Sequence, residues 1–270
     1  MASLGCDVII GARDILTAEV VIKASQRNNS KGKITFIPLD LADTGSIKKF
    51  AELVPFEKID FLINNAGVMR IPERRLTKQG EEMQWGVNHL GHFYLTYLLW
   101  PKIKRSPNFR IINLSSMGHK KNFMRSINPT PDFDDINYEK SYDPAIAYGK
   151  SKLYNVLFTR ALAQRIDPTR GKVLSVHPGG VRTDLTREMK LSIVAKIAAG
   201  LLYPVYWFIT KNPWQGCQTT LYCALSDDVE NGCYYADCKK DSENVEVTQG
   251  NWERLWDISE KHLGITFKTD

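Results

Sequence analysis

The sequence predicts an α/β fold in which helices cover both faces of a parallel sheet. Apolar runs of strand length recur along the chain, and they are continuous rather than alternating, as in strands that are buried on both faces. Segments with helical period separate these runs, most clearly at 80–103 and 144–166. This alternation is typical of parallel sheets, because parallel strands are joined by crossovers that usually contain a helix.

The elements are expected in the following order. A short helical turn at 1–5 stops at Gly5 and leads into a strand at 6–12, which ends in a turn at 13–14. Later strands are expected at 33–41, 60–67, 109–116, 172–180 and, shorter, at 232–238. A long loop at 120–144 follows a strand end, where ligand-binding loops lie in such sheets. Without a repeat or linker, residues 1–270 are interpreted as a single domain.

The composition of the chain limits which classes of binding partner and which cellular compartment are expected. The net charge of +6 comes from scattered basic residues, so no nucleic acid is expected as a partner. The five cysteines are odd in number and irregularly spaced, which favours a reducing compartment over a disulfide framework. An apolar segment at 191–209 contains Lys196 and Pro204, which disfavour a spanning helix. We interpret it as part of an apolar lid at 186–210 that contacts a membrane surface, with a helix packed on the core as the alternative.

The strongest candidate for chemistry is a tyrosine and lysine pair. Tyr148 and Lys152 are four residues apart in a helical segment, so they share one helix face. A phenol with a pKa of about 10 is a poor acid at neutral pH, and a neighbouring ammonium lowers that pKa. Tyr235 and Lys239 have the same spacing, but they are expected in an extended run, where four residues span about 13 Å. Tyr148 is therefore the expected acid/base.

Polar residues at two strand ends and in one helix support this site. Ser115 and Ser116 end the strand at 109–116, although serines there are also common turn formers. The small residues of 64–67 would let a flat ring approach the backbone closely. Asn88 lies among apolar residues and glycines, which favours a buried polar role over an exposed one.

Five motifs carry a family resemblance. NNAG, VNHLGHF, NLSS, AYGKSK and HPGGVRTDL stand in an order and spacing that resemble the short-chain dehydrogenase/reductases, and within them the retinol dehydrogenase group. The resemblance covers 4–265 and implies a Rossmann-type, doubly wound parallel sheet. It also implies an NADP(H)-dependent oxidoreductase that interconverts a lipophilic alcohol and its aldehyde or ketone, with a retinol- or retinal-like substrate. The implied location is the cytoplasmic side of the endoplasmic reticulum membrane, with the cytoplasm as the alternative.

The resemblance implies a catalytic set of four residues: Asn88, Ser116, Tyr148 and Lys152. Tyr148 would act as acid/base on the substrate oxygen, and Ser116 would hydrogen-bond that oxygen. Lys152 would lower the pKa of Tyr148 and hold the nicotinamide ribose. Asn88 would anchor a water that relays protons to Lys152.

The resemblance also implies where the cofactor binds. Asp40 and Leu41 would lie at the adenine, and Tyr148 and Lys152 at the nicotinamide ribose. The remaining implied contacts are Asn64, Ala66 and Gly67 on the adenosine ribose side, and Pro178, Gly179, Val181 and Thr183 at the nicotinamide carboxamide. In this fold an Arg near the end of the second strand accommodates the 2′-phosphate of NADP, so Arg13 predicts an NADP(H) preference.

The histidines give weaker signals. His89 and His92 have a spacing that could suit a metal, but two ligands without a third make a weak site, and no metal is expected. His119 is expected to line the substrate cleft or to lie exposed.

The first residues suggest that the sheet lacks its first, central strand and glycine-rich loop. In related folds a glycine-rich turn lies about 20 residues before the residue that selects between NAD and NADP. Arg13, which has that place here, is only the thirteenth residue of the sequence, so the turn does not fit before it. The strands at 6–12 and 60–67 would then each have an unpaired edge. We expect a shortened form of a longer chain that is poorly stable alone and binds NADPH weakly. A truncated, catalytically impaired or non-enzymatic chain is the alternative function.

Overall fold

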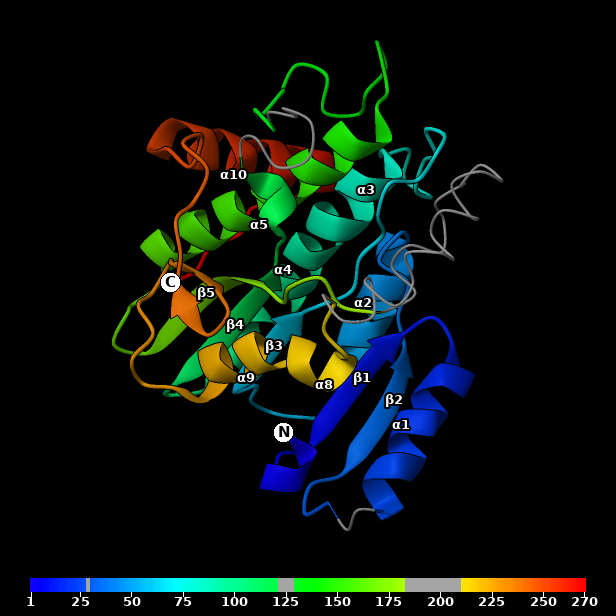
Figure 1. Cartoon of the computed structure of the whole chain (residues 1–270), viewed down its shortest axis with the longest axis vertical. Coiled ribbons are helices and arrows are strands. Elements are labelled where there is room, and N and C mark those ends of the chain that lie inside the picture. The colour runs from blue at the N-terminus through cyan, green and yellow to red at the C-terminus, as the bar shows by residue number, and fades with distance from the viewer. Residues whose placement is uncertain (28–29, 121–128, 183–209) are drawn as a thin grey trace.

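The strands form two separate sheets (Figure 1). The computed structural model describes residues 1–27, 30–120, 129–182 and 210–270. In the first sheet β1 (Val8–Ala12) and β2 (Ile34–Pro38) pair in parallel, and α1 (Ile15–Arg27) connects them. The second sheet has the order β3-β4-β5-β6-β7. Its strands are β3 (Phe61–Asn64), β4 (Phe109–Leu114), β5 (Gly171–His177), β6 (Tyr234–Ala236) and β7 (Lys239–Lys240).

Helices fill the connections between the parallel strands. They include α2 (Thr44–Leu53), α4 (Gly91–Ile103), α5 (Pro144–Arg165) and α9 (Gln218–Leu225), with the short helices α3 (Met83–Trp85) and α8 (Pro213–Gly216). Helix α10 (Gln249–Leu263) follows the last strand and packs on α5. Shorter helical turns are η1 (Ala2–Leu4), the π-helical η2 (Gly86–Leu90) and η3 (Met117–His119). The α/β class with a parallel sheet is thus confirmed.

Local sequence fixes two of the predicted boundaries. The turn η1 ends at Gly5, whose φ of 95° is the left-handed conformation that glycine adopts without strain. Asp143 is the N-cap of helix α5, and its carboxylate accepts hydrogen bonds from the amides of Ala145 and Ile146 at 2.8 Å each. Pro144 follows at the first helical position, where its missing N–H costs nothing.

The prediction of one extended run at 232–238 is wrong. The chain reverses at Asp237 and Cys238, whose φ angles of 48° and 57° form a tight turn, so β6 and β7 are the two arms of a hairpin. Tyr235 therefore pairs with Lys240 across the hairpin, and its hydroxyl accepts a hydrogen bond from the Glu230 amide at 2.8 Å. This hydroxyl is engaged in holding a loop.

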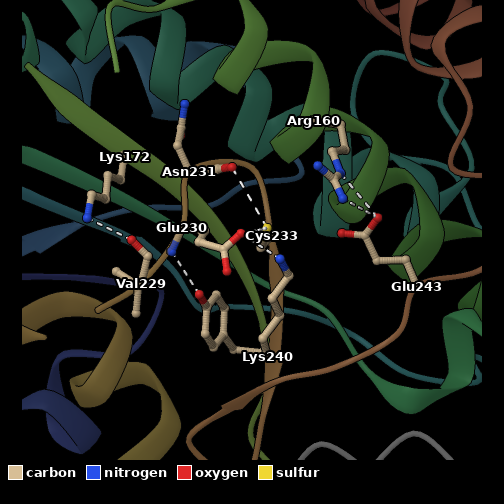
Figure 2. A network of polar contacts seen from close by, with 9 residues as sticks. Arg160, Lys172, Val229, Glu230, Asn231, Cys233, Lys240 and Glu243 are labelled. Atoms are coloured by element: carbon tan, nitrogen blue, oxygen red, sulfur yellow. Dashed lines mark hydrogen bonds and ion pairs between the residues drawn. The ribbon is translucent and has the colours of Figure 1, made fainter. Parts of the chain in front are cut away.

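Polar contacts anchor this C-terminal part to the sheet and to α5 (Figure 2). The Lys172 ammonium of β5 donates to the Val229 carbonyl at 2.7 Å. The Arg160 guanidinium of α5 donates through two nitrogens to one Glu243 carboxylate oxygen, at 2.9 and 3.1 Å. These contacts fix the position of β6 beside β5.

The second sheet carries the best-packed core. Strands β4 and β5 are almost wholly buried, and α4 and α5 cover them with aromatic and aliphatic side chains. In β1, by contrast, every residue is only half-buried. Within the described ranges, no helix has both the length and the apolarity needed to cross a membrane. The apolar segment at 191–209 lies outside them.

Among the open edges of the two described sheets, those of β1 and β3 border one cleft. On β1 the Val8 amide donates to Lys33 and the Ala12 carbonyl accepts from Leu39, so Val8 and Ala12 face β2. Because alternate residues of a strand face opposite edges, the backbone groups of Ile9 and Gly11 point the other way. Residues of β1 and β3 line a cleft of about 900 Å³ between these edges.

Candidate active site

Strand β4 and helix α5 bring the two predicted hydroxyl groups together. Ser116 lies just beyond β4 at the start of η3, and Tyr148 lies in the second turn of α5. A Cβ built on Gly118 would lie 3.5 Å from the Ser116 Oγ and 3.6 Å from the Tyr148 Cε1. Both side chains therefore lie at one corner of the carboxyl edge of the sheet.

The second serine of the pair is the one at this corner. The Ser115 hydroxyl donates to the Lys152 carbonyl of α5 at 2.7 Å, so it ties the strand to the helix. The Ser116 hydroxyl accepts from the Gly118 amide at 3.1 Å and also hydrogen-bonds with Tyr148. Of the two serines, Ser116 is therefore the one whose hydroxyl lies beside Tyr148.

Burial and neighbouring groups shift the pKa of the Tyr148 phenol in opposite directions. Its side chain is only 8% exposed, and burial raises its pKa above the ordinary value. The hydrogen bond with Ser116 and the positive charge of Arg70 lower the pKa. Neighbouring groups thus offset part of the cost of forming a buried phenolate.

Lys152 and Asn88 approach Tyr148 from the interior. The Lys152 ammonium lies 5.9 Å from the centre of the Tyr148 ring and donates to the Leu114 carbonyl at 3.1 Å. Burial lowers the pKa of Lys152 to about 8. The Asn88 amide is fully buried and holds the backbone of Val68 at both its N–H and its C=O, at 2.8 and 2.9 Å.

A glycine lets these two side chains meet the backbone after β3. A Cβ on Gly67 would lie 3.0 Å from the Asn88 Oδ1 and 3.4 Å from the Lys152 Nζ. The bare backbone of Gly67 thus leaves a cradle between Asn88 and Lys152 that a side chain would fill. The Asn88 side chain is bonded to Val68 and Ser151. The Lys152 ammonium has three N–H donors and makes one hydrogen bond within the described ranges, to Leu114, so Lys152 is the group that suits a ribose hydroxyl.

The Asn64 side chain does not reach this edge. Its amide donates to the Asn113 Oδ1 at 2.8 Å and to the Thr96 hydroxyl at 3.2 Å. The Asn113 amide donates in turn to the Thr159 hydroxyl at 2.9 Å, which makes a buried polar chain between the sheet and its helices. Ala66, two residues after Asn64, is exposed at the strand end. A cofactor would meet Asn64 through its backbone only.

The predicted adenine end lies beside β1 and β2. Arg13 follows β1 and is exposed. Asp14 caps α1, since its carboxylate accepts from the Leu16 amide at 2.9 Å and from the Thr17 hydroxyl at 2.8 Å. These hydrogen bonds also lower the pKa of Asp14, that from Thr17 most. The Asp14 carboxylate is therefore committed to capping α1.

Asp40 and Leu41 follow β2 with different surroundings. The Asp40 carboxylate accepts from the Ala42 amide at 2.9 Å, and its own amide donates to the Ser46 hydroxyl at 2.9 Å. Leu41 is buried in the core, and its carbonyl would lie 2.7 Å from a Cβ on Gly91. The structure therefore places Asp40 at the strand end and the Leu41 side chain in the core beneath it.

The segment after β5 supplies the other predicted contacts. Pro178 and Gly179 follow the strand, and Gly179 has a φ of 92° with the Lys211 side chain within 3.0 Å of a built Cβ. Val181 pairs with Lys211 in an isolated parallel bridge. Thr183 and most of the proposed lid at 186–210 lie outside the described residues.

The histidines that the sequence singles out, His89, His92 and His119, are buried. The His89 Nε2 lies 2.9 Å from the Ser259 hydroxyl of α10, and burial lowers its pKa to about 3. The His92 Nδ1 lies 3.0 Å from the Asn88 carbonyl. His119 is fully buried rather than exposed, with Nδ1 2.5 Å from the Ser116 carbonyl. Across the described ranges, no cluster of three metal-ligating side chains occurs.

Sequence reasoning missed two residues beside Tyr148. Arg70 has a φ of 49°, which is uncommon for a non-glycine residue, and its charge acts on Tyr148. The buried Gln84 accepts from the Arg70 amide at 2.7 Å. Neither residue belongs to a motif, and only the folded chain brings them to α5.

Comparison with known proteins identifies the family. The short chain dehydrogenase model matches residues 1–128. Retinol dehydrogenase 12 from Mus musculus is 40% identical over 273 residues, which cover 99% of this chain and 82% of that protein. The chain belongs to the short-chain dehydrogenase family. Retinol dehydrogenase 14 from Mus musculus is also 40% identical, over 97% of this chain and 80% of that protein.

Two solved structures share the fold. A protein of uncharacterised function from Mycobacterium paratuberculosis is 30% identical with a TM-score of 0.74, over 98% of this chain and 87% of that one. The NADPH-bound carbonyl reductase from chicken fatty liver is 19% identical with a TM-score of 0.59, over 87% of each chain, which shows the fold alone. The architecture is therefore Rossmann-like.

Proposed function

We propose that the protein is an NADP(H)-dependent oxidoreductase that interconverts a lipophilic alcohol and its aldehyde or ketone, with a retinol- or retinal-like substrate. The observation that carries the proposal is the corner where Ser116 and Tyr148 adjoin, backed by the buried Lys152. The similarity to retinol dehydrogenases supports the substrate class.

Each residue of the corner has a distinct task in this proposal. Tyr148 gives a proton to the substrate oxygen or takes one from it, and Ser116 hydrogen-bonds the same oxygen. Lys152 holds the nicotinamide ribose and passes protons to Tyr148. Asn88 fixes the backbone of Val68 and so shapes the floor of the site. The bound nicotinamide supplies or accepts the hydride.

The cofactor is proposed to be NADP(H). Gly67 lies between Asn88 and Lys152 at the nicotinamide end, and Arg13 offers a guanidinium for the 2′-phosphate. Asp40 is proposed to lie at the adenine. In related folds the pyrophosphate binds at the turn from the central strand to its helix. The described residues place no such turn in the space between the facing edges of β1 and β3.

We infer that the sheet lacks its central strand. The free edges of β1 and β3 border one cleft lined by apolar residues such as Ile9 and Leu62. One additional strand, parallel to both neighbours, would bond the backbone groups of Ile9 and Gly11 on one side and of Phe61 on the other. Its glycine-rich loop would then reach the pyrophosphate.

The same cleft favours a second candidate function, a chain of this fold with impaired or no catalysis. Without the strand, the cofactor would lose its pyrophosphate contacts, and the chain could persist as a binding protein only. NADPH titration followed by tryptophan fluorescence separates the two, since the chain has six tryptophans. A catalyst must bind NADPH, and an impaired chain must not.

We further propose that residues 1–270 form one domain, that the lid at 186–210 covers the substrate, and that 191–209 contacts the endoplasmic reticulum membrane from its cytoplasmic side. No nucleic acid is proposed as a partner, and cytoplasmic location is the alternative. Flotation of the chain with phospholipid vesicles tests the membrane contact. Recovery of the chain only from the vesicle-free fraction would contradict it.

The test of the proposed function is retinal reduction with NADPH by the parent chain, Tyr148→Phe and Tyr235→Phe. Loss of the Tyr148 proton should lower turnover by about 10²–10⁴-fold, the usual contribution of general acid catalysis, while NADPH binding stays unchanged. Tyr235→Phe should retain parent turnover, because that hydroxyl contacts only the Glu230 loop. Equal losses in both variants would contradict the assignment.

A further inference from the structure

Arg70 stands on a strained piece of backbone next to the site. Its φ of 49° is a left-handed conformation, which is strained for a non-glycine residue. Strain of this kind persists only where the surroundings enforce it, and it often marks a functional position.

Two buried side chains hold the backbone on both sides of this position. The Gln84 side-chain oxygen accepts from the Arg70 amide at 2.7 Å. The Tyr142 hydroxyl donates to the Ile71 carbonyl at 2.8 Å and accepts from the Gln84 amide at 3.0 Å. Gln84, Tyr142 and the 70–71 peptide thus form a closed clamp that stabilises the left-handed turn.

The clamp is joined to the helix that carries Tyr148. The Gln84 amide also donates to the Pro144 carbonyl in the first turn of α5, at 3.2 Å. Tyr148 lies one turn further along the same helix. The fold therefore sets the backbone of Arg70 in a fixed position relative to the Tyr148 side chain.

We propose that Arg70 supplies positive charge beside the Tyr148 hydroxyl and that the Gln84–Tyr142 clamp positions it there. The inference rests on the proposed role of Tyr148 and adds a residue that acts through it. Arg70 lowers the pKa of Tyr148, and a guanidinium stays charged at every working pH. Lys152, whose pKa burial lowers to about 8, loses its charge in mildly basic solution.

The other groups that face Tyr148 in the described ranges are few. From η3 come the Ser116 hydroxyl, which also lowers the pKa of Tyr148, and behind it His119, which burial keeps neutral at ordinary pH with a pKa of about 4. From α5 itself comes Lys152. Lys152 does not lower the pKa of Tyr148 in this structure, so removing Arg70 should leave Ser116 as the group that lowers it.

The test reads the ionisation of position 148 directly, without substrate. A 3-fluorotyrosine incorporated only at position 148 gives a single fluorine NMR signal, and fluorination lowers the phenol pKa toward a range where the chain stays folded. Arg70→Met should raise the titration midpoint, because it removes a positive charge that lowers the pKa of Tyr148. Arg70→Lys should restore most of the shift. Gln84→Met, which loosens the clamp, should move the midpoint in the same direction by less.

Arg74→Met is the matched control, because it removes an equal charge from the same loop, where Arg74 donates to the Asn137 carbonyl. Its midpoint should equal that of the parent chain. An unchanged midpoint in Arg70→Met, or an equal rise in Arg74→Met, would overturn the inference. A chain that is inactive toward retinal contradicts the proposed function instead, and the midpoint still decides the role of Arg70.

Discussion

The two ends of the cofactor site differ in how well the fold supports them. Around β4 and α5 every strand has neighbours on both sides, and Asn88 and Lys152 make buried hydrogen bonds. Around β1 and α1 one strand edge is open, and Leu16 and Val20 of α1 are 69% and 68% exposed. The acid/base corner is thus held rigidly, while the adenine end rests on a two-stranded sheet that is marginal alone.

The difference in support between the two ends of the cofactor site should shrink when a strand is supplied to the open edges of β1 and β3. A soluble, lysine-flanked peptide with a Val/Ile-rich core should bind between β1 and β3 and raise the stability of the chain by several kcal/mol, because each backbone hydrogen bond contributes about 1 kcal/mol and apolar burial adds to it. The measurement is the melting temperature with and without peptide. A peptide with proline at its centre is the control, since proline lacks the N–H that a central strand needs. Equal shifts from both peptides would argue against a strand site.

The substitution Lys152→Met measures how much stability the acid/base corner loses to its buried charge. Burial lowers the pKa of Lys152 to about 8, so below that pH the folded chain carries a buried charge that destabilises it. Above the unfolded pKa of about 10.4 the amine is neutral in both states and the penalty vanishes. Lys152→Met should abolish turnover and yet raise the free energy of unfolding at neutral pH by on the order of 1–3 kcal/mol. The gain should shrink as pH rises through this interval.

Denaturant unfolding over a pH series measures this gain. Lys48→Met, a change at an exposed position of α2, should leave stability unchanged at every pH. A gain from Lys152→Met that does not vary with pH would show that packing, rather than the buried charge, is responsible.

The smallest expected effect concerns the adenine end. Arg13→Ala should reduce the preference for NADPH over NADH by about tenfold, which corresponds to roughly 1.4 kcal/mol for a lost charge-assisted contact on an exposed arginine. The measurement is the ratio of the two dissociation constants. Lys23→Ala on α1, where the ammonium pairs with Glu19, serves as the control. An unaltered ratio in Arg13→Ala would make that residue a plain surface charge.

The sequence predicted the parts of the molecule that depend on local pattern. Continuous apolar runs located the strands, and the spacing of Tyr148 and Lys152 located the helix face at the site. It could not predict the hairpin at 237–238, because left-handed Asp and Cys residues carry no turn signal as strong as glycine. Nor could it predict Arg70, which reaches α5 through a clamp of residues from three separate segments.

The side chain of Asn64 shows the same limit. Its place at a strand end predicts a cofactor contact, but strand periodicity cannot say that its amide joins Asn113 and Thr96 inside the fold. The direction of a side chain at a strand end depends on its long-range partners.

Residue-resolved hydrogen exchange of the 270-residue chain tests the central claim most directly, because it compares the two regions in one experiment. The amides of Ile9 and Gly11 on the open edge of β1, and of Phe61 on that of β3, should exchange at least about 100-fold faster than those of Ile112 and Leu174 in the buried strands. The Val8 amide, which is bonded to Lys33, should exchange at an intermediate rate. Protection of Ile9, Gly11 and Phe61 equal to that of Leu174 would contradict the account, because it would mean that both edges are already paired.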